Sequence, residues 1–405
     1  MAGSRNIPGV QGVPRPGPGS PRSLRQANRR RVLSALARDG VLSQADLSRA
    51  TGLAASTVSG LVHELAADGE LTLERQSAGR GTQLVRLAVP PGVVVGLDNG
   101  RQHLAVAVAD LNGELLADER MRISAGLSAV ESMAELDRLV DRVLSAAGKQ
   151  RADVRCGALA LPAPVDISSG RVGSMEIEPR WSGIDPAALA RDVLGFDVSV
   201  HNDTNVGAIG EARRGAGRGA NHFAYIWISE GLGAGLMLNN SLYAGVTGIA
   251  GELGHTLQRA ETGALCRCGN RGCLETVVST PAVIRLLEAQ LGPISSFDEV
   301  LERVKAGDAL CRRVLAQTGR HIGVAVTNLV NLLNPQRVII GGELSTAGDV
   351  LLKPIGEMIH QYAIPSAAAR VEVVRSELGK RSEVIGAAMM ALADNGVRVA
   401  SVEAS

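Results

Sequence analysis

The stretch Gly251-Glu-Leu-Gly-His255, followed by Cys266-Arg-Cys268-Gly-Asn-Arg-Gly-Cys273-Leu-Glu275, is the most informative part of this 405-residue chain. It places one imidazole and three thiols at His-x10-Cys-x-Cys-x4-Cys spacing, with two glycines that give the loop room to wrap a small ion. Zinc prefers four tetrahedral thiolate and imidazole ligands, and such a closed site is normally structural. We therefore predict a Zn²⁺ site made of His255, Cys266, Cys268 and Cys273. The alternative is a set of free thiols or a disulfide, although three thiols cannot pair evenly.

The bulk composition indicates a soluble protein of two or three domains. Apolar residues make up 45% of the chain and aromatic residues 2%, so the cores must be built from Ala, Val, Leu and Ile. We find neither an uninterrupted apolar run of about 20 residues nor a signal peptide. Zinc thiolates without paired cysteines are typical of a reducing compartment. We therefore expect a cytoplasmic protein with no membrane partner.

Charge is distributed unevenly along the chain. Residues 1–88 hold 12 Arg and 6 acidic residues, a balance of +6, whereas the remainder holds 30 basic and 35 acidic residues, a balance of −5. A basic head on a mildly acidic body indicates that contacts with nucleic acid are confined to the head.

The head has the pattern of a winged helix-turn-helix. Residues 1–22 contain five Pro and five Gly and are predicted to be a disordered tail. Residues 23–88 form the predicted domain, with three short helices (about 24–38, 43–51 and 55–67) and a hairpin (70–75 and 83–88). Helix three would lie in the major groove and the wing tip would reach the DNA backbone or minor groove. The predicted DNA contacts are Arg29, Arg30, Ser56, Thr57, Ser59 and Arg80. The alternative is a small helical domain used only for protein contacts.

From residue 93 the chain alternates strands and helices, which predicts an α/β fold of two lobes with a cleft between them. We expect this domain over residues 93–395, with lobe one at about 93–202 plus a C-terminal helix at 383–395, and lobe two at about 203–382. The expected strands are 93–98, 103–110, 114–123, 156–161, 197–201, 223–229, 234–238, 337–341 and 371–376. The expected helices are 130–147, 185–194, 280–291, 297–306, 310–333, 349–362 and 383–394.

Together with these features, several motifs resemble the ROK family of repressors, open reading frames and sugar kinases, in its winged-helix repressor branch. Besides the His/Cys stretch, they are Leu161-Pro-Ala-Pro-Val-Asp166, His201-Asn-Asp203-Thr-Asn205, Gly231-Leu-Gly-Ala-Gly235 and Leu333-Asn-Pro-Gln-Arg-Val-Ile-Ile-Gly-Gly342. The resemblance covers about residues 23–395. It implies a two-lobed actin-like (ribonuclease H-like) ATPase fold, a structural zinc ion, and a homodimer or homotetramer. It also implies that the sugar-binding positions are Asn202, Asp203, Glu252, His255 and Glu275.

The two glycine-rich turns that face ATP phosphates in the family's kinases are both altered. The first usually reads Asp-x-Gly-Gly-Thr and is here Asp98-Asn99-Gly100-Arg101-Gln102. The second usually reads Gly-Thr-Gly-x-Gly and is here Ser229-Glu230-Gly231-Leu232-Gly233, so that a carboxylate would face phosphate. Two like charges about 4 Å apart repel by about 4 kcal/mol at an effective dielectric constant near 20. We therefore expect no ATP binding and no kinase activity, with Asp203 the vestige of the catalytic base.

Retained sugar residues, altered phosphate turns and a DNA-binding head indicate a sugar-responsive transcriptional regulator, most simply a repressor. The expected partners are a double-stranded DNA operator, a sugar or sugar-phosphate effector and further copies of the chain, with association with the nucleoid when DNA is bound. Two alternatives remain open. One is an active sugar kinase with an added DNA-binding domain, and the other is a repressor controlled by a partner protein.

Overall fold

The structure is a computed structural model that describes residues 21–75, 83–88, 92–124, 126–166, 168–173, 177–258 and 263–394. The chain divides into two compact units, Met1–Pro90 and Pro91–Ser405, which are described separately. Within the described ranges, no helix combines the length and the apolar character that crossing a bilayer requires.

The first unit is the predicted winged helix-turn-helix. Its helices are α1 (Pro21–Asp39), α2 (Gln44–Thr51) and α3 (Ala55–Ala67), and its strands β1 (Leu42–Ser43), β2 (Leu71–Arg75) and β3 (Gln83–Leu87) form a sheet in the order β1-β3-β2. The predicted capping box is confirmed, because Ser43 and Asp46 each accept a hydrogen bond from the other's backbone N–H. Pro21 and Arg22, which composition assigns to the tail, belong to the first turn of α1, where proline is well tolerated.

Lobe one of the second unit is a five-stranded mixed sheet in the order β6-β5-β4-β7-β8. Apolar side chains of one face pack against α4 and α5. The strands are β4 (Val93–Asn99), β5 (His103–Asp110), β6 (Leu115–Arg122), β7 (Val154–Leu161) and β8 (Val198–Asn202), and the helices are α4 (Ala129–Ala146) and α5 (Pro186–Leu194).

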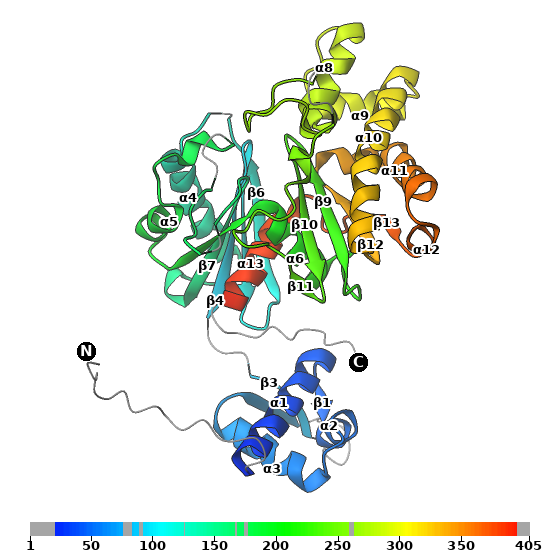
Figure 1. The fold of residues 1–405 in the computed structure, drawn as a ribbon. Helices are drawn as coiled ribbons and strands as arrows, with labels where there is room; N and C mark the ends of the chain where they lie inside the picture. Colours follow the sequence, from blue (N-terminus) through cyan, green and yellow to red (C-terminus); the bar gives the residue numbers. More distant parts are fainter. Residues whose placement is uncertain are drawn as a thin grey trace, which may run out of the picture. The chain divides into compact units, whose positions relative to one another are not determined.

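Lobe two repeats this arrangement with a second five-stranded sheet in the order β11-β10-β9-β12-β13. One of its faces packs against the long helix α10 and its neighbours (Figure 1). The strands are β9 (Phe223–Ile228), β10 (Leu232–Leu238), β11 (Ser241–Leu242), β12 (Arg337–Gly341) and β13 (Glu372–Arg375). The helices are α7 (Glu275–Val278), α8 (Thr280–Leu291), α9 (Phe297–Lys305), α10 (Ala309–Leu333), α11 (Asp349–Tyr362) and α12 (Pro365–Ala368).

Two helices, α6 (Asp203–Arg214) and α13 (Ser382–Asp394), lie between the two sheets (Figure 1). Helix α13 packs mainly on the lobe-one sheet and α6 packs on β9 and β10 of lobe two. The two helices cross closely, because a Cβ at Gly386 would lie 1.7 Å from the carbonyl oxygen of Val206. This helix pair therefore connects the lobes.

Most predicted elements are confirmed to within two residues, whereas α6 was not predicted. The His201-Asn-Asp203-Thr-Asn205 motif ends β8 and begins α6, so Asp203 is the first residue of a 12-residue helix. Asn202 caps this helix, since its Oδ1 accepts a hydrogen bond from the backbone N–H of Asn205 at 3.0 Å. The short elements β1, β11, α7 and α12 were also not predicted.

Candidate functional site

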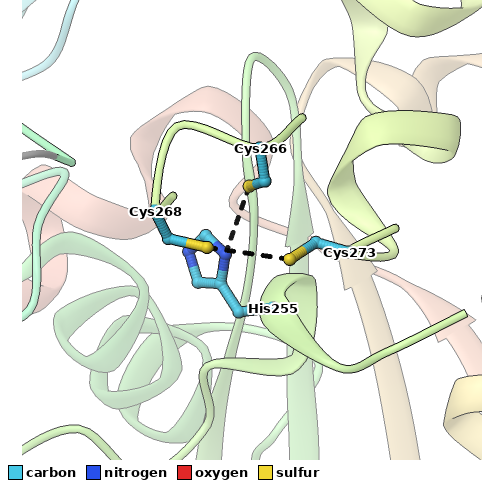
Figure 2. A group of neighbouring side chains, drawn as sticks. All are labelled: His255, Cys266, Cys268 and Cys273. Atoms are coloured by element: carbon cyan, nitrogen blue, oxygen red, sulfur yellow. Dashed lines mark hydrogen bonds between the residues drawn. The ribbon is translucent and has the colours of Figure 1, made fainter. Parts of the chain in front are cut away.

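The four predicted metal ligands form one cluster. Figure 2 shows their side chains pointing toward one another, and the ligand atoms all lie within 4.8 Å of each other. The Sγ of Cys266 lies 3.5 Å from Nδ1 of His255, and the Sγ atoms of Cys268 and Cys273 are 3.7 Å apart. Ligands at about 2.3 Å (sulfur) and 2.1 Å (nitrogen) in tetrahedral geometry would be separated by about 3.6–3.8 Å. The cluster can therefore hold a metal ion of this type. None of the five cysteines forms a disulfide in the structure, so free thiols are the alternative to a metal site.

The Gly-Glu-Leu-Gly-His segment lies directly against β10 because its glycines permit close contact. A Cβ at Gly251 would lie 1.7 Å from the carbonyl oxygen of Ala234, and a Cβ at Gly254 would lie 2.2 Å from that of Leu232. Gly251 also has φ of 97°, a conformation that disfavours other residues. The two glycines thereby fix where Glu252 and His255 stand relative to the sheet.

His255 joins the thiol cluster to the cleft. Its Nδ1 faces the thiols, whereas its Nε2 lies 3.8 Å from Oε2 of Glu252. Burial lowers the pKa of the imidazole, which favours the neutral form that binds metals. Glu275 follows the last cysteine and is held by β10 and the loop: its Oε2 accepts from the N–H of Leu232 at 3.2 Å and its Oε1 from Nε of Arg267 at 2.8 Å.

Asp203 is the carboxylate that stands at the start of α6. Its Oδ1 accepts a hydrogen bond from the backbone N–H of Thr204 at 2.6 Å. Burial, and then the neighbouring Asp98 carboxylate, raises the pKa of Asp203 to about 6. Burial, with Asp203 and Glu275 nearby, likewise raises the pKa of Glu252 to about 7. The cleft thus contains carboxyl groups that hold protons more tightly than free ones do.

All five predicted sugar positions line one cavity between the lobes, with a volume of about 870 Å³. A cavity of this size takes a small organic ligand. Within it, carboxylates, an amide and an imidazole offer paired acceptors and donors of the kind that hydroxyl groups need. The five are Asn202, Asp203, Glu252, His255 and Glu275.

The residues that replace the first phosphate turn are bonded to acidic groups and carbonyls of the protein itself. The guanidinium of Arg101 pairs with buried Glu178, at 3.0 Å from Nε to Oε2, and its Nη2 donates to the carbonyls of Pro162 and Ile177. His103 Nε2 lies 2.7 Å from Oδ2 of buried Asp98. In the same cavity, Gln102 Nε2 donates to Oε1 of Glu230, which belongs to the second phosphate turn.

In the winged-helix unit, the predicted DNA contacts fall into three groups. Ser56 and Thr57 are exposed on α3 and Ser59 is half-buried, while Arg30 is exposed on α1. Arg29 instead pairs with Asp68 and Glu64, at 2.8 and 3.2 Å, and with Glu70, so it tethers α1 to the end of α3 and the start of β2. Arg80 lies outside the described residues.

Sequence reasoning did not identify Glu178 or Arg267 as part of the site. Glu178 is 2% exposed and pairs with both Arg101 and Arg180. Arg267 orients Glu275 and donates to the carbonyl of Glu230 at 2.8 Å. The position of Arg267 between two cysteines of the cluster could have indicated that it belongs to the site, whereas nothing in the local sequence distinguishes Glu178.

Comparison with known proteins identifies both units. The model of the ROK family matches residues 94–394, and that of the MarR family matches residues 26–80. The xylose repressor of Caldicellulosiruptor bescii is 26% identical over 92% of this chain and 96% of its own length. The DNA-binding transcriptional repressor Mlc of Escherichia coli is 29% identical over 92% and 95%. A glucokinase of Halalkalibacterium halodurans is 31% identical over 72% of this chain and 92% of its own.

A solved structure shows the same relationship. The crystal structure of a ROK family transcriptional regulator, described as a homologue of the E. coli Mlc protein, has a TM-score of 0.74 and 28% identity. The match covers 94% of this chain and all of that one. The similarity therefore extends over both the head and the two-lobed body.

Proposed function

This chain belongs to the ROK family, and from that premise we propose that it is a sugar-responsive, DNA-binding transcriptional regulator, most directly a repressor of carbohydrate metabolism. One observation supports this most strongly. A winged-helix unit is joined to a body whose cleft is lined by the carboxylates of the proposed sugar site, while Gln102 and Glu230 of the two altered phosphate turns are bonded to each other.

Zn²⁺ is the proposed metal, held by His255, Cys266, Cys268 and Cys273. Its contribution would be structural, because four protein ligands leave no open position for substrate. Nδ1 of His255 faces the thiols. With a metal bound at Nδ1, Nε2 would carry the ring proton and would donate a hydrogen bond to a ligand hydroxyl in the cleft. The metal would also hold in place the loop of Cys266, Cys268 and Cys273, and thereby the position of Glu275.

The proposed effector is a sugar that contacts both lobes. Asn202 ends β8 of lobe one and Asp203 begins α6, whereas Glu252, His255 and Glu275 belong to lobe two. A ligand that bridges these groups binds the closed arrangement of the lobes better than the open one and shifts the equilibrium by that difference in affinity. In a homodimer or homotetramer, closure would change the spacing of paired heads on an operator.

Binding of DNA is assigned to α3 and its surroundings. The N-terminus of α3 has no side-chain cap, so its first N–H groups are available to a phosphate. Ser56, Thr57 and Ser59 can reach base edges, and Arg30 and Arg80 can contact the backbone. Because these side chains offer few base-specific contacts, we expect much of the affinity to be electrostatic and salt-dependent.

The decisive test measures DNA binding with and without sugars. A duplex selected from a random library would be titrated with the full chain by fluorescence anisotropy, with a panel of sugars added. We expect at least one sugar to change the affinity, and Glu252→Gln and Glu275→Gln to remove that change while DNA binding persists. Glu302→Gln, an exposed change on α9, is the matched control. A response that survives in both cleft variants would favour control by a partner protein.

An active kinase is the second candidate, favoured by the glucokinase relative. The contacts of Arg101 and Gln102 oppose it, because both side chains stand in the altered first phosphate turn and are bonded to Glu178 and Glu230 of the protein. A coupled assay of ADP release with the same sugars distinguishes the two functions. Steady sugar-dependent turnover would contradict our assignment of a non-enzymatic regulator.

A further inference from the structure

A hydrogen bond connects the two altered phosphate turns across the cleft. Gln102 lies in the turn between β4 and β5 of lobe one, and its Nε2 donates to Oε1 of Glu230, which lies between β9 and β10 of lobe two. A second contact between lobes joins Arg122 of β6 to Asp298 of α9, at 3.4 Å. All four residues line the same cavity. The two lobes are therefore bridged across this cavity by the protein's own side chains.

Arg101 stands at this boundary. A Cβ built on Gly231 would lie 3.7 Å from Nη1 of Arg101, 3.6 Å from Nη2 of Arg267 and 2.8 Å from Oε2 of Glu275. Burial, and then the charge of Arg267, lowers the pKa of Arg101. The nearby carboxylates of Glu178, Asp203 and Glu230 oppose this shift only in part. Arg101 thus lies within electrostatic reach of Asp203 on the sugar side and of Glu230 on the other.

Neither guanidinium is free to neutralise an incoming phosphate. Arg101 pairs with Glu178 and donates to two carbonyls, while Arg267 pairs with Glu275 and donates to the carbonyl of Glu230. The carboxylates of Asp203 and Glu230 remain on the two sides of the boundary. Arg120, Arg122, Arg285 and Lys380 also line the cavity, but at this boundary Asp203 and Glu230 are carboxylates with no ion pair among the described contacts.

We propose that Arg101, Gln102 and Glu230 make the cleft select an unphosphorylated sugar and reject its phosphate ester. This inference rests on the proposed sugar-sensing function. A phosphate on the hydroxyl beside Asp203 would project toward Glu230 and the bridge from Gln102. A phosphomonoester carries nearly two negative charges at neutral pH. Because like charges in contact at a protein surface weaken binding by up to about a thousandfold, we expect at least about 100-fold discrimination.

Isothermal titration of the full chain with matched pairs tests this directly. The probes are glucose, mannose and N-acetylglucosamine, each with its 6-phosphate. We expect any neutral sugar that binds to do so at least about 100-fold more tightly than its ester. An ester that binds as tightly as its parent sugar, or more tightly, overturns the inference and leaves sugar sensing intact. Failure of every compound to bind contradicts the sugar-sensing function as well.

Two variants separate charge from obstruction. Glu230→Gln removes the charge and keeps a side chain that can contact Gln102, so we expect discrimination to fall by about tenfold or more. Gln102→Ala removes the bridge and should lower discrimination less, because the carboxylate remains. Glu357→Gln and Gln361→Ala, exposed on α11, are matched controls that should leave the ratio unchanged. Discrimination that is unaffected by Glu230→Gln would refute the electrostatic basis of the inference.

Discussion

Asp203→Asn should stabilise the body at neutral pH while removing its sugar response. Burial and the adjacent Asp98 raise the pKa of Asp203 to about 6 from its ordinary 3.8. A shift of about two pKa units is equivalent to about 3 kcal/mol. Because part of the side chain still faces the solvent-filled cleft, screening reduces this figure, and we expect a gain of about 1–3 kcal/mol in the free energy of unfolding.

The sign follows from comparing the folded and unfolded states. Since the pKa of Asp203 is higher in the folded chain, the native state binds the proton more tightly than the unfolded state does, and protonation stabilises the fold. The wild type therefore gains stability as the pH falls from about 6 toward about 4, whereas the variant has no such group. The advantage of Asp203→Asn is largest above pH 6 and disappears near pH 4.

Urea unfolding followed by tryptophan fluorescence reports the stability of the body and not of the head, because Trp181 and Trp227 are the only tryptophans and both belong to the body. Asp192→Asn, at a side chain 75% exposed, is the control and should change stability by less than about 0.5 kcal/mol. A variant less stable than wild type at pH 7.5 would refute the reasoning, as would a difference that grows between pH 6 and pH 4.5.

Three further predictions address the crossing of α6 and α13, the metal cluster and the winged-helix head. Gly386→Ala should destabilise the body by about 3 kcal/mol, since its Cβ would lie 1.7 Å from the carbonyl oxygen of Val206. Gly356→Ala, where a Cβ would meet open space, is the control and should not destabilise it. Equal urea midpoints for the two variants would contradict this prediction. Cys268→Ser should lower the zinc content and abolish the sugar response, while the melting temperature of the head stays unchanged. A normal sugar response after complete removal of the metal by a chelator would show that the metal does not hold the cleft residues in place. Arg30→Ala should weaken DNA binding and reduce the slope of log K against log salt by about 1, so an unchanged slope would exclude a phosphate contact.

Strongly patterned elements were predictable from the sequence, and α6 shows why one was not. Buried strands such as Val93–Asn99 are marked by a short continuous apolar run, and long amphipathic helices such as Ala309–Leu333 by their helical periodicity. Helix α6 contains Gly207 and Gly210, which lower helix propensity. In the structure a Cβ at Gly210 would lie 2.3 Å from the carbonyl of Ser382 on α13, so the glycines serve the crossing of the two helices. Tertiary packing overrides local propensity here.

The same distinction applies to the site. The metal cluster could be predicted because three of its four ligands lie on one short loop, and His255 ends the glycine-containing segment 251–255 that lies against β10. The pairing of Arg101 with Glu178 and of Gln102 with Glu230 could not be predicted, because the partners are 77 and 128 residues apart. The first pair meets only when lobe one is folded, and the second only when both lobes are. Sequence reasoning therefore predicted that the phosphate turns were altered, and the structure shows what their replacements contact.

The position of Asp203 explains how a small ligand could control the arrangement of the lobes. Asp203 is the first residue of α6, and α6 packs on α13 through close helix contact, while α13 packs on the lobe-one sheet. A sugar that draws Asp203 toward Glu252 would therefore pull on the helix pair that connects the lobes, and not on a flexible loop. Gln102 and Glu230 also bridge the lobes. Because the bridge lowers the cost of closure, a sugar alone would need to supply only the remaining difference in free energy between the open and closed states.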